Sequence, residues 1–445
     1  MSRSRIALIV SAFALALAGA AGVSSTRAGL SRTSATIDGT PVELITPAGP
    51  ASAPRPGVIV VHGFSGSRQL MYGVAQTLAR NGYAAAVIDL PGHGQNRARF
   101  PTQGRGAPGF DRTLTYVMAW LRTVPGVNAD QLALVGHSMG AGAVVRFASR
   151  DADITATVAI SGGGSAGRVQ RPSSPRNLLL LAGNWEPAGI RAACGAALTA
   201  AYPGAALGQV HGSWADGSAR QCLIVPDVEH IGILFSDTAV TAIVRWLDAA
   251  FGITPARRDV ATAGPGRWAL VLHLSAALLL LVLIDRLFRA DPDAASRGPD
   301  DTQFPHRLPR GAVAIILAVP TLLAALVMRV IPGGWFPLLT ADYLCGFYLI
   351  TGVAIALGLR QLGVPLLGRP VGAGLVGRAV FVAVVALGLF AGVAHHTWLN
   401  MWLIAPRLWL AALVFPTWLV YFVAQDRLLR TRPAREYFPG SLLCT

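Results

Sequence analysis

The chain has 445 residues and a formal net charge of +15; 53% of its residues are hydrophobic and only 13% are charged. Its mean hydropathy of +0.50 excludes a single soluble domain, and its length suggests about two or three domains. All basic residues are arginines, and many of them flank long apolar runs. Arginines at the ends of apolar runs are typical of membrane proteins, so we expect a membrane protein. Because no basic stripe with interleaved aromatic residues is present, we expect no nucleic-acid partner.

The first apolar run, residues 6–23, follows Arg3 and Arg5 and is rich in alanine and leucine. As a helix, a run of about 18 residues would span about 27 Å. Residues 1–25 are therefore interpreted as a cleaved signal peptide or an uncleaved signal anchor. Small residues at 18–22 leave both possibilities open, and both would export the segment that follows.

Residues 37–252 alternate between short apolar runs and helical patterns, which predicts a doubly wound, mostly parallel α/β sheet. Between the apolar runs lie helical patterns at residues 69–82, 110–124, 140–150 and 238–251. The predicted strands are GVIVVHG (57–63), YAAAVIDL (83–90), QLALVGHS (131–138), ATVAISGG (156–163), NLLLLAG (177–183) and QCLIVPD (221–227).

The stretch GHSMG at 136–140 joins a predicted strand to a predicted helix and matches the nucleophile-elbow pattern GxSxG. Its glycines permit a sharp turn that would lift the Ser138 hydroxyl above the sheet edge. The same turn would point the backbone N–H of Met139 toward a developing oxyanion. The alternative is that Ser138 is an ordinary turn residue, and only the strand-turn-helix context favours a nucleophile.

A nucleophilic serine needs a base, and His230 is the best candidate. It follows the last predicted strand and precedes the helical pattern at 238–251, which places it at the same sheet edge as Ser138. The alternative is an exposed loop histidine. We expect His62 to support a loop, His93 to brace a turn, and His137 to point away from the nucleophile.

Glu186 is the candidate acid that would orient the base. It follows the end of the strand at 177–183, which gives the chain order Ser138, Glu186, His230. Asp216 and Asp227 are competing candidates, and a solvated loop carboxylate is the alternative reading of Glu186.

Four segments together resemble the α/β-hydrolase superfamily over about residues 37–252. The resemblance implies an oxyanion hole made by the backbone N–H groups of Phe64 and Met139, and an acid at the position of Glu186, where aspartate is commoner. It implies acyl transfer through a covalent intermediate, without a metal or a cofactor. The segments are VVHGFSGSRQLMYGVAQTLARNGYAAAVIDLPGHG, LVGHSMGAG, LLLLAGNWEP and VPDVEHIGIL.

The long segment 185–220 could form a cap over the site, and its composition suggests a modestly apolar substrate. Cys194 and Cys222 both lie in the segment that we expect to be exported, so a disulfide between them is chemically allowed. Two buried free thiols are the alternative.

After a linker at 253–267, residues 268–424 predict a five-helix transmembrane bundle, followed by a cytoplasmic tail at 425–445. Each apolar run is close to the roughly 20 residues that cross a bilayer. Buried core helices are the alternative. The runs are residues 268–288, 311–331, 336–359, 379–397 and 402–424.

The arginines predict one orientation, with the N-terminus and the C-terminus inside and the segment 37–252 outside. Loops at 285–310 and 360–378 and the tail carry arginines, whereas those at 332–335 and 398–401 do not; only the linker arginines disagree. Four polar residues sit toward the outer ends of the predicted spans, where they could line a lipid or metal site or be hydrated interfacial residues. They are His273, Asp342, His395 and His396.

The sequence therefore predicts a membrane-anchored extracytoplasmic serine hydrolase that acts on small-molecule or lipid esters. An acyltransferase or a peptidase would use the same three residues. A non-catalytic α/β domain that senses a ligand, or a transporter with an accessory domain, are alternatives from other classes.

Overall fold

The computed structural model describes residues 3–50, 52–101, 107–162, 172–254, 259–262, 308–331, 341–366 and 397–431, and isolated positions within 271–278 and 377–395. The chain divides into two compact units. The first comprises Met1–Leu283 together with Val384–Trp402, and the second comprises Ile284–Ala383 and Leu403–Thr445.

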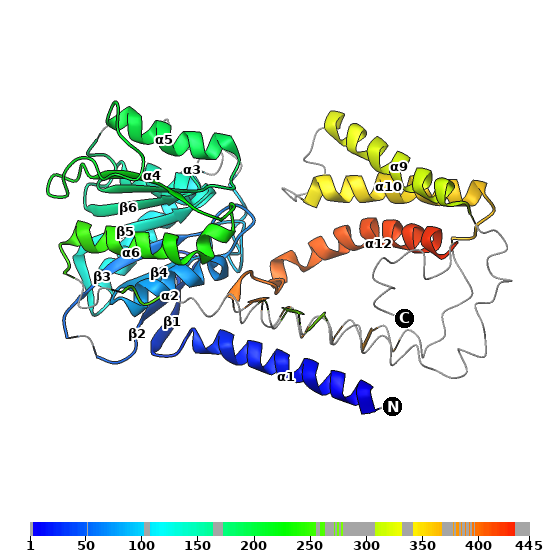
Figure 1. Cartoon of the computed structure of the whole chain (residues 1–445), viewed down its shortest axis with the longest axis horizontal. Helices are drawn as coiled ribbons and strands as arrows, with labels where there is room; N and C mark the ends of the chain where they lie inside the picture. Colours follow the sequence, from blue (N-terminus) through cyan, green and yellow to red (C-terminus); the bar gives the residue numbers. More distant parts are fainter. Residues whose placement is uncertain are drawn as a thin grey trace. The chain divides into compact units, whose positions relative to one another are not determined.

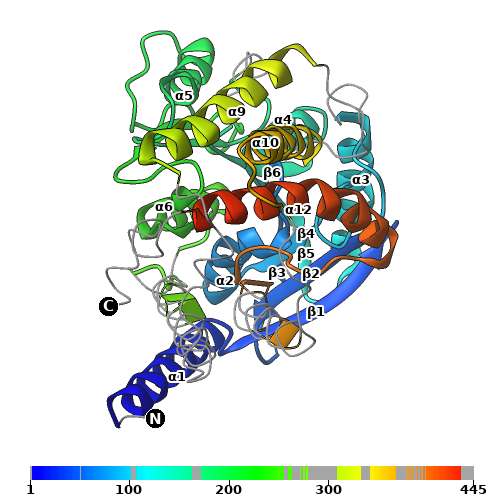
Figure 2. The same ribbon diagram turned by 90° about the vertical axis from the view of Figure 1, so that its right-hand side faces the viewer.

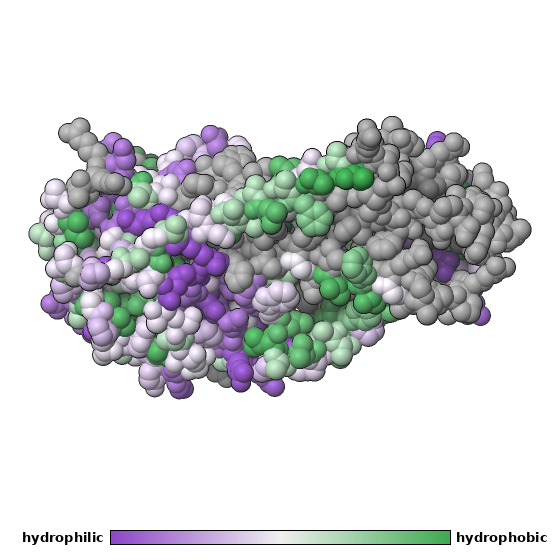
Figure 3. Space-filling view, turned by 90° about the horizontal axis from the view of Figure 1, so that it is seen from below, coloured by the Kyte–Doolittle hydropathy of each residue, from purple (hydrophilic) through white to green (hydrophobic). Residues whose placement is uncertain are grey.

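An apolar helix, α1 (Arg3–Ser25), opens the first unit and leads into an antiparallel hairpin of β1 (Leu30–Ile37) and β2 (Thr40–Pro47). Large apolar side chains of α1 are exposed, among them Phe13 and Leu17. Figure 3 shows hydrophobic residues gathered over the stretch of the molecule where α1 lies in Figure 1. Strand β1 lies before the expected start of the globular segment at residue 37, because its alternating pattern is weaker than the continuous apolar runs of the central strands.

A single eight-stranded sheet forms the centre of the first unit, in the order β1-β2-β4-β3-β5-β6-β7-β8. Strand β2 is antiparallel to β4, and all pairs from β4 to β8 are parallel. The six predicted strands are all present, so the expectation of a mostly parallel sheet is confirmed. They are β3 (Arg55–Val61), β4 (Ala84–Ile88), β5 (Val127–His137), β6 (Ile154–Ile160), β7 (Leu178–Gly183) and β8 (Arg220–Val225).

Helices cover both faces of the sheet, as Figures 1 and 2 show. Alternate residues of each central strand enter different cores, so Val58 and Val60 pack with α2 and α6, whereas Ile59 and Val61 pack with α3 and α4. Burial on both faces explains why these strands are continuous apolar runs. The helices are α2 (Tyr72–Arg80), α3 (Ala107–Thr123), α4 (Met139–Ala148), α5 (Ala188–Ala201) and α6 (Asp237–Phe251), with short 3-10 turns at Arg68–Met71 and Gly232–Phe235.

The expectation that residues 185–220 form a cap is wrong. Helix α5 packs Ala197 and Leu198 against β7, in a core shared with α4. The chain then returns to the starting edge of the strands, where the Leu178 N–H donates to Ala219 O over 2.9 Å. A connection between two parallel strands must carry the chain from the end of one strand to the start of the next, and this segment does that. A disulfide joins Cys194 of α5 to Cys222 of β8, with the two Cα atoms 5.9 Å apart.

The second unit contains three helices that are long and apolar enough to cross a membrane, at Arg310–Val330, Asp342–Gln361 and Ala405–Leu429. They coincide with α9 (Arg310–Val330), α10 (Ala341–Gln361) and α12 (Leu408–Arg430), the last preceded by a 3-10 turn at Ala405–Arg407. They match three of the five expected runs as candidate spans. The runs at 268–288 and 379–397, with His273 and His396, lie largely or wholly outside the described residues.

Candidate active site

Ser138 stands at the turn between β5 and α4, with a positive φ of 53°. Its backbone N–H donates to Ile160 O on the neighbouring strand over 2.8 Å, which holds the turn against the sheet. The flanking glycines are needed because the helix start lies so close to the strands. A Cβ at Gly136 would lie 2.4 Å from Gly140 O, and one at Gly140 would lie 2.5 Å from His62 O.

The structure brings Ser138, His230 and Glu186 into one hydrogen-bonded series. The Ser138 Oγ lies 3.0 Å from His230 Nε2, and His230 Nδ1 lies 2.6 Å from Glu186 Oε1. The three residues follow β5, β8 and β7, whose parallel course brings their carboxyl ends to one edge of the sheet. The His230 side chain is 34% exposed, whereas the Glu186 side chain is fully buried.

Glu186 is held as a buried carboxylate. Burial by itself would raise the pKa of this group, but hydrogen bonds from His230 and from the Gly183 N–H outweigh burial, and the pKa lies below its ordinary value. The Gly183 bond to Glu186 Oε2 is 2.7 Å long. An ionised carboxylate can only accept, so His230 Nδ1 carries the proton and Nε2 is left as an acceptor for the Ser138 hydroxyl.

His137, which we expect to point away from the nucleophile, contacts the base His230. Its ring centroid lies 4.9 Å from that of His230, and its Nε2 donates to His230 O over 2.8 Å. A carbonyl only accepts, so the proton sits on Nε2, while the buried Nδ1 has no partner among the described residues. Burial lowers the pKa of His137 to about 4, so the ring is neutral and holds the loop that carries His230.

His62 and His93 bond to backbone atoms of the neighbouring loops. The His62 Nε2 accepts from the Leu90 N–H at 3.0 Å, and its Nδ1 donates to Gly63 O at 2.7 Å. Burial, followed by the charge of His93, lowers the pKa of His62 to about 3. The His93 ring lies 5.0 Å from the His62 ring, and its Nδ1 contacts Pro91 O. Both rings therefore brace loops.

The amides expected to bind an oxyanion belong to Phe64, which follows β3, and to Met139, the first residue of α4. Within the described residues, neither N–H donates to another protein group. Met139 is at a helix start, where N–H groups have no partner inside the helix. Both amides are therefore free to donate to a ligand.

A buried ion pair that the sequence reading missed holds the loop after β3. The Asp89 carboxylate accepts from the Arg68 backbone N–H at 2.8 Å, from the Arg68 guanidinium at 2.5 Å and from the Gln95 N–H at 3.0 Å. Asp89 is fully buried at the end of β4. The sequence does hold a signal for this ion pair, since Asp89 directly follows the continuous apolar strand in AAAVIDL. A charge at such a buried position requires partners.

The competing acids lie elsewhere. Asp216 caps a turn by accepting from the Ser218 N–H at 2.7 Å, on the amino-terminal side of the strands. Asp227 is exposed after β8. Among the described residues, no three histidine, cysteine, aspartate or glutamate side chains gather closely enough to hold a metal ion.

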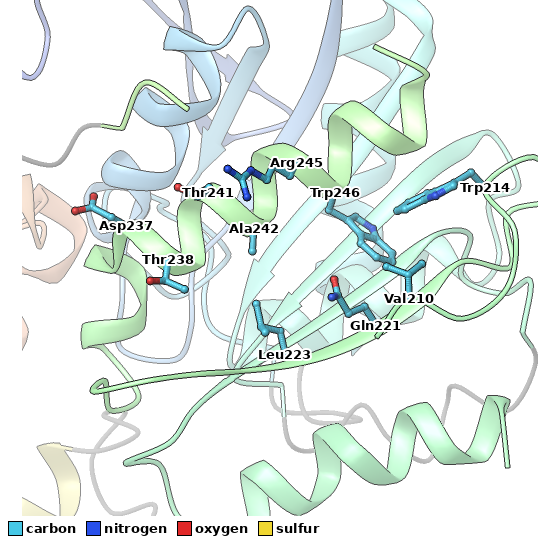
Figure 4. A pocket seen from close by; sticks show the side chains of 10 residues that line it. All are labelled: Val210, Trp214, Gln221, Leu223, Asp237, Thr238, Thr241, Ala242, Arg245 and Trp246. Carbon is cyan, nitrogen blue, oxygen red and sulfur yellow. The ribbon is translucent and has the colours of Figure 1, made fainter. Parts of the chain in front are cut away.

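A pocket of about 600 Å³ lies between β8 and α6 and is separate from the Ser138 site. Figure 4 shows Trp214 and Trp246 beside each other, with Leu223 and Gln221 of β8 opposite the helix. The pocket is lined by neither serine nor histidine. Its side chains therefore supply no nucleophile with a base.

The family model described as serine aminopeptidase, S33, matches residues 52–186. This match supports the resemblance of the segment at about residues 37–252 to the α/β-hydrolase superfamily. No curated protein matches the chain.

Three solved structures with a similar fold each cover about half of the chain. The chain is 17% identical to a protein from Klebsiella pneumoniae described as a dienelactone hydrolase, with a TM-score of 0.37 over 50% of this chain and 98% of the other. It is 16% identical to an esterase of Pyrococcus furiosus, with a TM-score of 0.38 over 51% and 94%. It is 15% identical to a bacterial membrane phospholipase A, with a TM-score of 0.36 over 55% and 96%.

Proposed function

We propose that the chain is a membrane-anchored serine hydrolase that cleaves carboxylic esters, with Ser138 as nucleophile, His230 as base and Glu186 as the acid that orients the base. The observation that carries this proposal is the series of contacts from Glu186 to His230 at 2.6 Å and from His230 to Ser138 at 3.0 Å. A buried carboxylate, a half-buried imidazole and a serine on a strained turn together are the parts that nucleophilic catalysis requires.

In the proposed reaction, His230 Nε2 takes the Ser138 proton while the serine oxygen attacks the ester carbonyl carbon. The N–H groups of Phe64 and Met139 donate to the oxyanion, and each such donor is worth about 3 to 4 kcal/mol in comparable sites. Collapse of the tetrahedral intermediate breaks the ester bond, and the leaving alcohol takes the proton from His230. A water molecule then attacks the acyl-enzyme by the same route and releases the acid.

Labelling with a fluorophosphonate probe tests the nucleophile directly. We expect the full chain in detergent to be labelled, and Ser138→Ala to lose all labelling. Ser149→Ala is the matched control, because Ser149 lies just past the other end of α4 and its Oγ donates to Val145 O within the same helix turn. A folded wild-type chain that resists the probe would remove the basis for the proposed enzyme.

A second candidate, a peptidase, is favoured by the description of the matching family model as a serine aminopeptidase. The same three residues can attack an amide, so the site geometry does not separate the two reactions. Comparing the turnover of p-nitrophenyl esters with that of aminoacyl p-nitroanilides separates the two reactions. The ester proposal requires the esters to have the higher kcat/KM, with both activities lost in Ser138→Ala.

We further propose that the hydrolase segment lies outside the cytoplasmic membrane and that the C-terminus lies inside. The disulfide between Cys194 and Cys222 supports this proposal because such bonds persist in oxidising compartments. The arginine-rich segment 285–310 and tail support it through the positive-inside rule.

A reporter fused after Thr445 should therefore behave as cytoplasmic, and one fused after Gly252 as exported. Alkaline phosphatase and green fluorescent protein fusions give opposite signals on the two sides. The reverse pattern at both positions would contradict the proposed orientation.

A further inference from the structure

Two large apolar side chains stand exposed on either side of Ser138. Phe64, after β3, is 45% exposed, and Trp185, after β7, is 64% exposed. Strand β5, which leads to Ser138, lies between β3 and β7 in the sheet order. At about 4.8 Å per strand, the ends of β3 and β7 are roughly 14 Å apart, so Phe64 and Trp185 flank the nucleophile.

The loop that carries Phe64 also contacts a second loop, around Asn400. The Asn400 backbone N–H donates to the Ser67 Oγ over 3.0 Å, and both residues belong to the first compact unit. Ser67 is only 1% exposed and Asn400 is half-buried, so the contact is partly shielded from solvent. The Asn400 side chain donates to Trp402 O at 2.8 Å, which closes the loop on itself.

The side chains around Asn400 are apolar and face outward. Trp398, Met401 and Trp402 are 41%, 39% and 43% exposed. With Phe64 and Trp185 they are five large apolar residues that the fold leaves uncovered at the end of the sheet where Ser138 lies. We call these five residues the apolar mouth. In water such a group is unfavourable unless something covers it.

The sequence around the mouth indicates a lipid surface as the partner. Three of the five side chains are tryptophans, which concentrate at membrane interfaces. The candidate span Ala405–Leu429 begins shortly after Trp402 in the sequence, so the loop around Asn400 is tethered to the end of an apolar helix. A loop at the end of a span stays at the membrane surface.

We propose that the apolar mouth is a lipid-facing surface and that Ser138 takes its ester from the bilayer, with the acyl chain entering between Phe64 and Trp185. This inference rests on the proposed esterase function and names its substrate class as a membrane-lipid ester. The Asn400 contact holds the oxyanion loop at the membrane surface, so that a lipid need not leave the bilayer fully to reach the serine.

Depth-dependent quenching tests the surface independently of catalysis. The full chain is reconstituted in phosphatidylcholine vesicles with an environment-sensitive fluorophore at Trp185→Cys, in a background of Cys345→Ala and Cys444→Ala. Tyr116→Cys is the matched control, because Tyr116 is an aromatic residue that is 45% exposed on α3. We expect spin-labelled lipids to quench the label at 185 strongly and the label at 116 weakly. Equal quenching at both positions overturns the proposal.

Kinetics test the substrate class. Trp185→Asn should raise the KM for a vesicle-borne phospholipid ester about tenfold more than the KM for a soluble short-chain ester, since it removes a large apolar anchor. Tyr116→Asn should leave both unchanged. An equal rise for both substrates in Trp185→Asn would mean that Trp185 contacts any ester and would overturn the lipid assignment.

The Asn400 contact has its own matched pair of variants. Asn400→Pro removes the backbone N–H that binds Ser67, whereas Asn400→Ala keeps it and removes only the side-chain bond to Trp402 O. The proline variant should lower turnover of the vesicle-borne ester more than the alanine variant does. Fluorophosphonate labelling is run on every sample: labelling without selective quenching overturns the lipid surface alone, and quenching without labelling overturns the esterase proposal alone.

Discussion

The two edges of the central sheet differ in what their polar groups do. At the carboxyl edge, Ser138 and His230 are half-buried beside open amides, with Glu186 buried behind them. At the amino edge, polar groups are buried and paired with protein atoms. The Trp246 Nε1–H donates to Asn177 O over 2.8 Å, and the Tyr83 hydroxyl donates to Asp248 Oδ1 over 2.5 Å.

The amino edge also buries a full charge. Arg220, at the start of β8, is fully buried, and its guanidinium donates to the carbonyl oxygens of Pro175 and Ala219. Burial lowers its pKa to about 10, and the group remains charged at neutral pH. Removing such a group costs stability, because a buried polar partner is left unpaired. Substitutions of Ser138, His230 and Glu186 should therefore change activity, whereas substitutions of the buried pairs at the amino edge should change stability.

The largest expected effect is a loss of activity on substitution at the carboxyl edge. Glu186→Gln should lower kcat/KM about 10⁴-fold, since an amide nitrogen can face His230 Nδ1 and favour the wrong tautomer. Its amino-edge counterpart is Tyr83→Phe, which should cost about 1 to 3 kcal/mol of unfolding free energy by leaving the buried Asp248 without its donor. Ester kinetics and urea unfolding are measured on both variants. An active Glu186→Gln enzyme, or an inactive but stable Tyr83→Phe enzyme, would break the comparison.

The next effect is on stability below neutral pH. The pKa values of His62 and His137 fall to about 3 and about 4 in the folded chain, whereas an unfolded imidazole titrates near 6.5. Between pH 6.5 and 4 the unfolded chain binds protons that the folded chain does not, so stability must fall as the pH falls through this window. His137 alone accounts for about 3 kcal/mol when the loss is complete.

The lowered pKa of Glu186 acts in the same direction, because its stabilisation is present above the unfolded pKa and lost as the pH falls through the folded one. Thermal unfolding of the full chain in detergent, at steps from pH 7 to 4.5, measures the slope. His137→Gln should flatten it. A melting temperature that stays constant over this range would show that the two imidazoles are hydrated.

The smallest effect concerns His137 as a positioning residue. His137→Phe keeps an aromatic ring but removes the donor to His230 O, and we expect kcat/KM to fall about tenfold as the His230 loop loosens. His137→Gln should recover part of the loss because its amide can donate from a similar position. If both variants behave alike, the hydrogen bond has no part in positioning the base.

The sequence alone predicted all six central strands and the placement of Ser138, Glu186 and His230 at one sheet edge. This was possible because strands buried on both faces are continuous apolar runs, and because parallel strands end at a common edge. The hairpin Leu30–Pro47 was missed, since no residue of β1 is buried and its sequence LSRTSATI alternates only weakly. Helix α5 was missed because its alanine-rich sequence has little apolar periodicity.

Local sequence patterns suffice to propose which residues carry acyl-transfer chemistry, because GxSxG and the strand-end positions restrict a nucleophile, an acid and a base to a few residues. The contacts of His137, Asp89 and Asn400 could be found only in the folded chain. The ring of His137 turns toward His230, Asp89 gathers three N–H donors from two loops, and Asn400 reaches Ser67 from far along the chain. Such contacts depend on side-chain direction and long-range packing, and local sequence patterns encode neither.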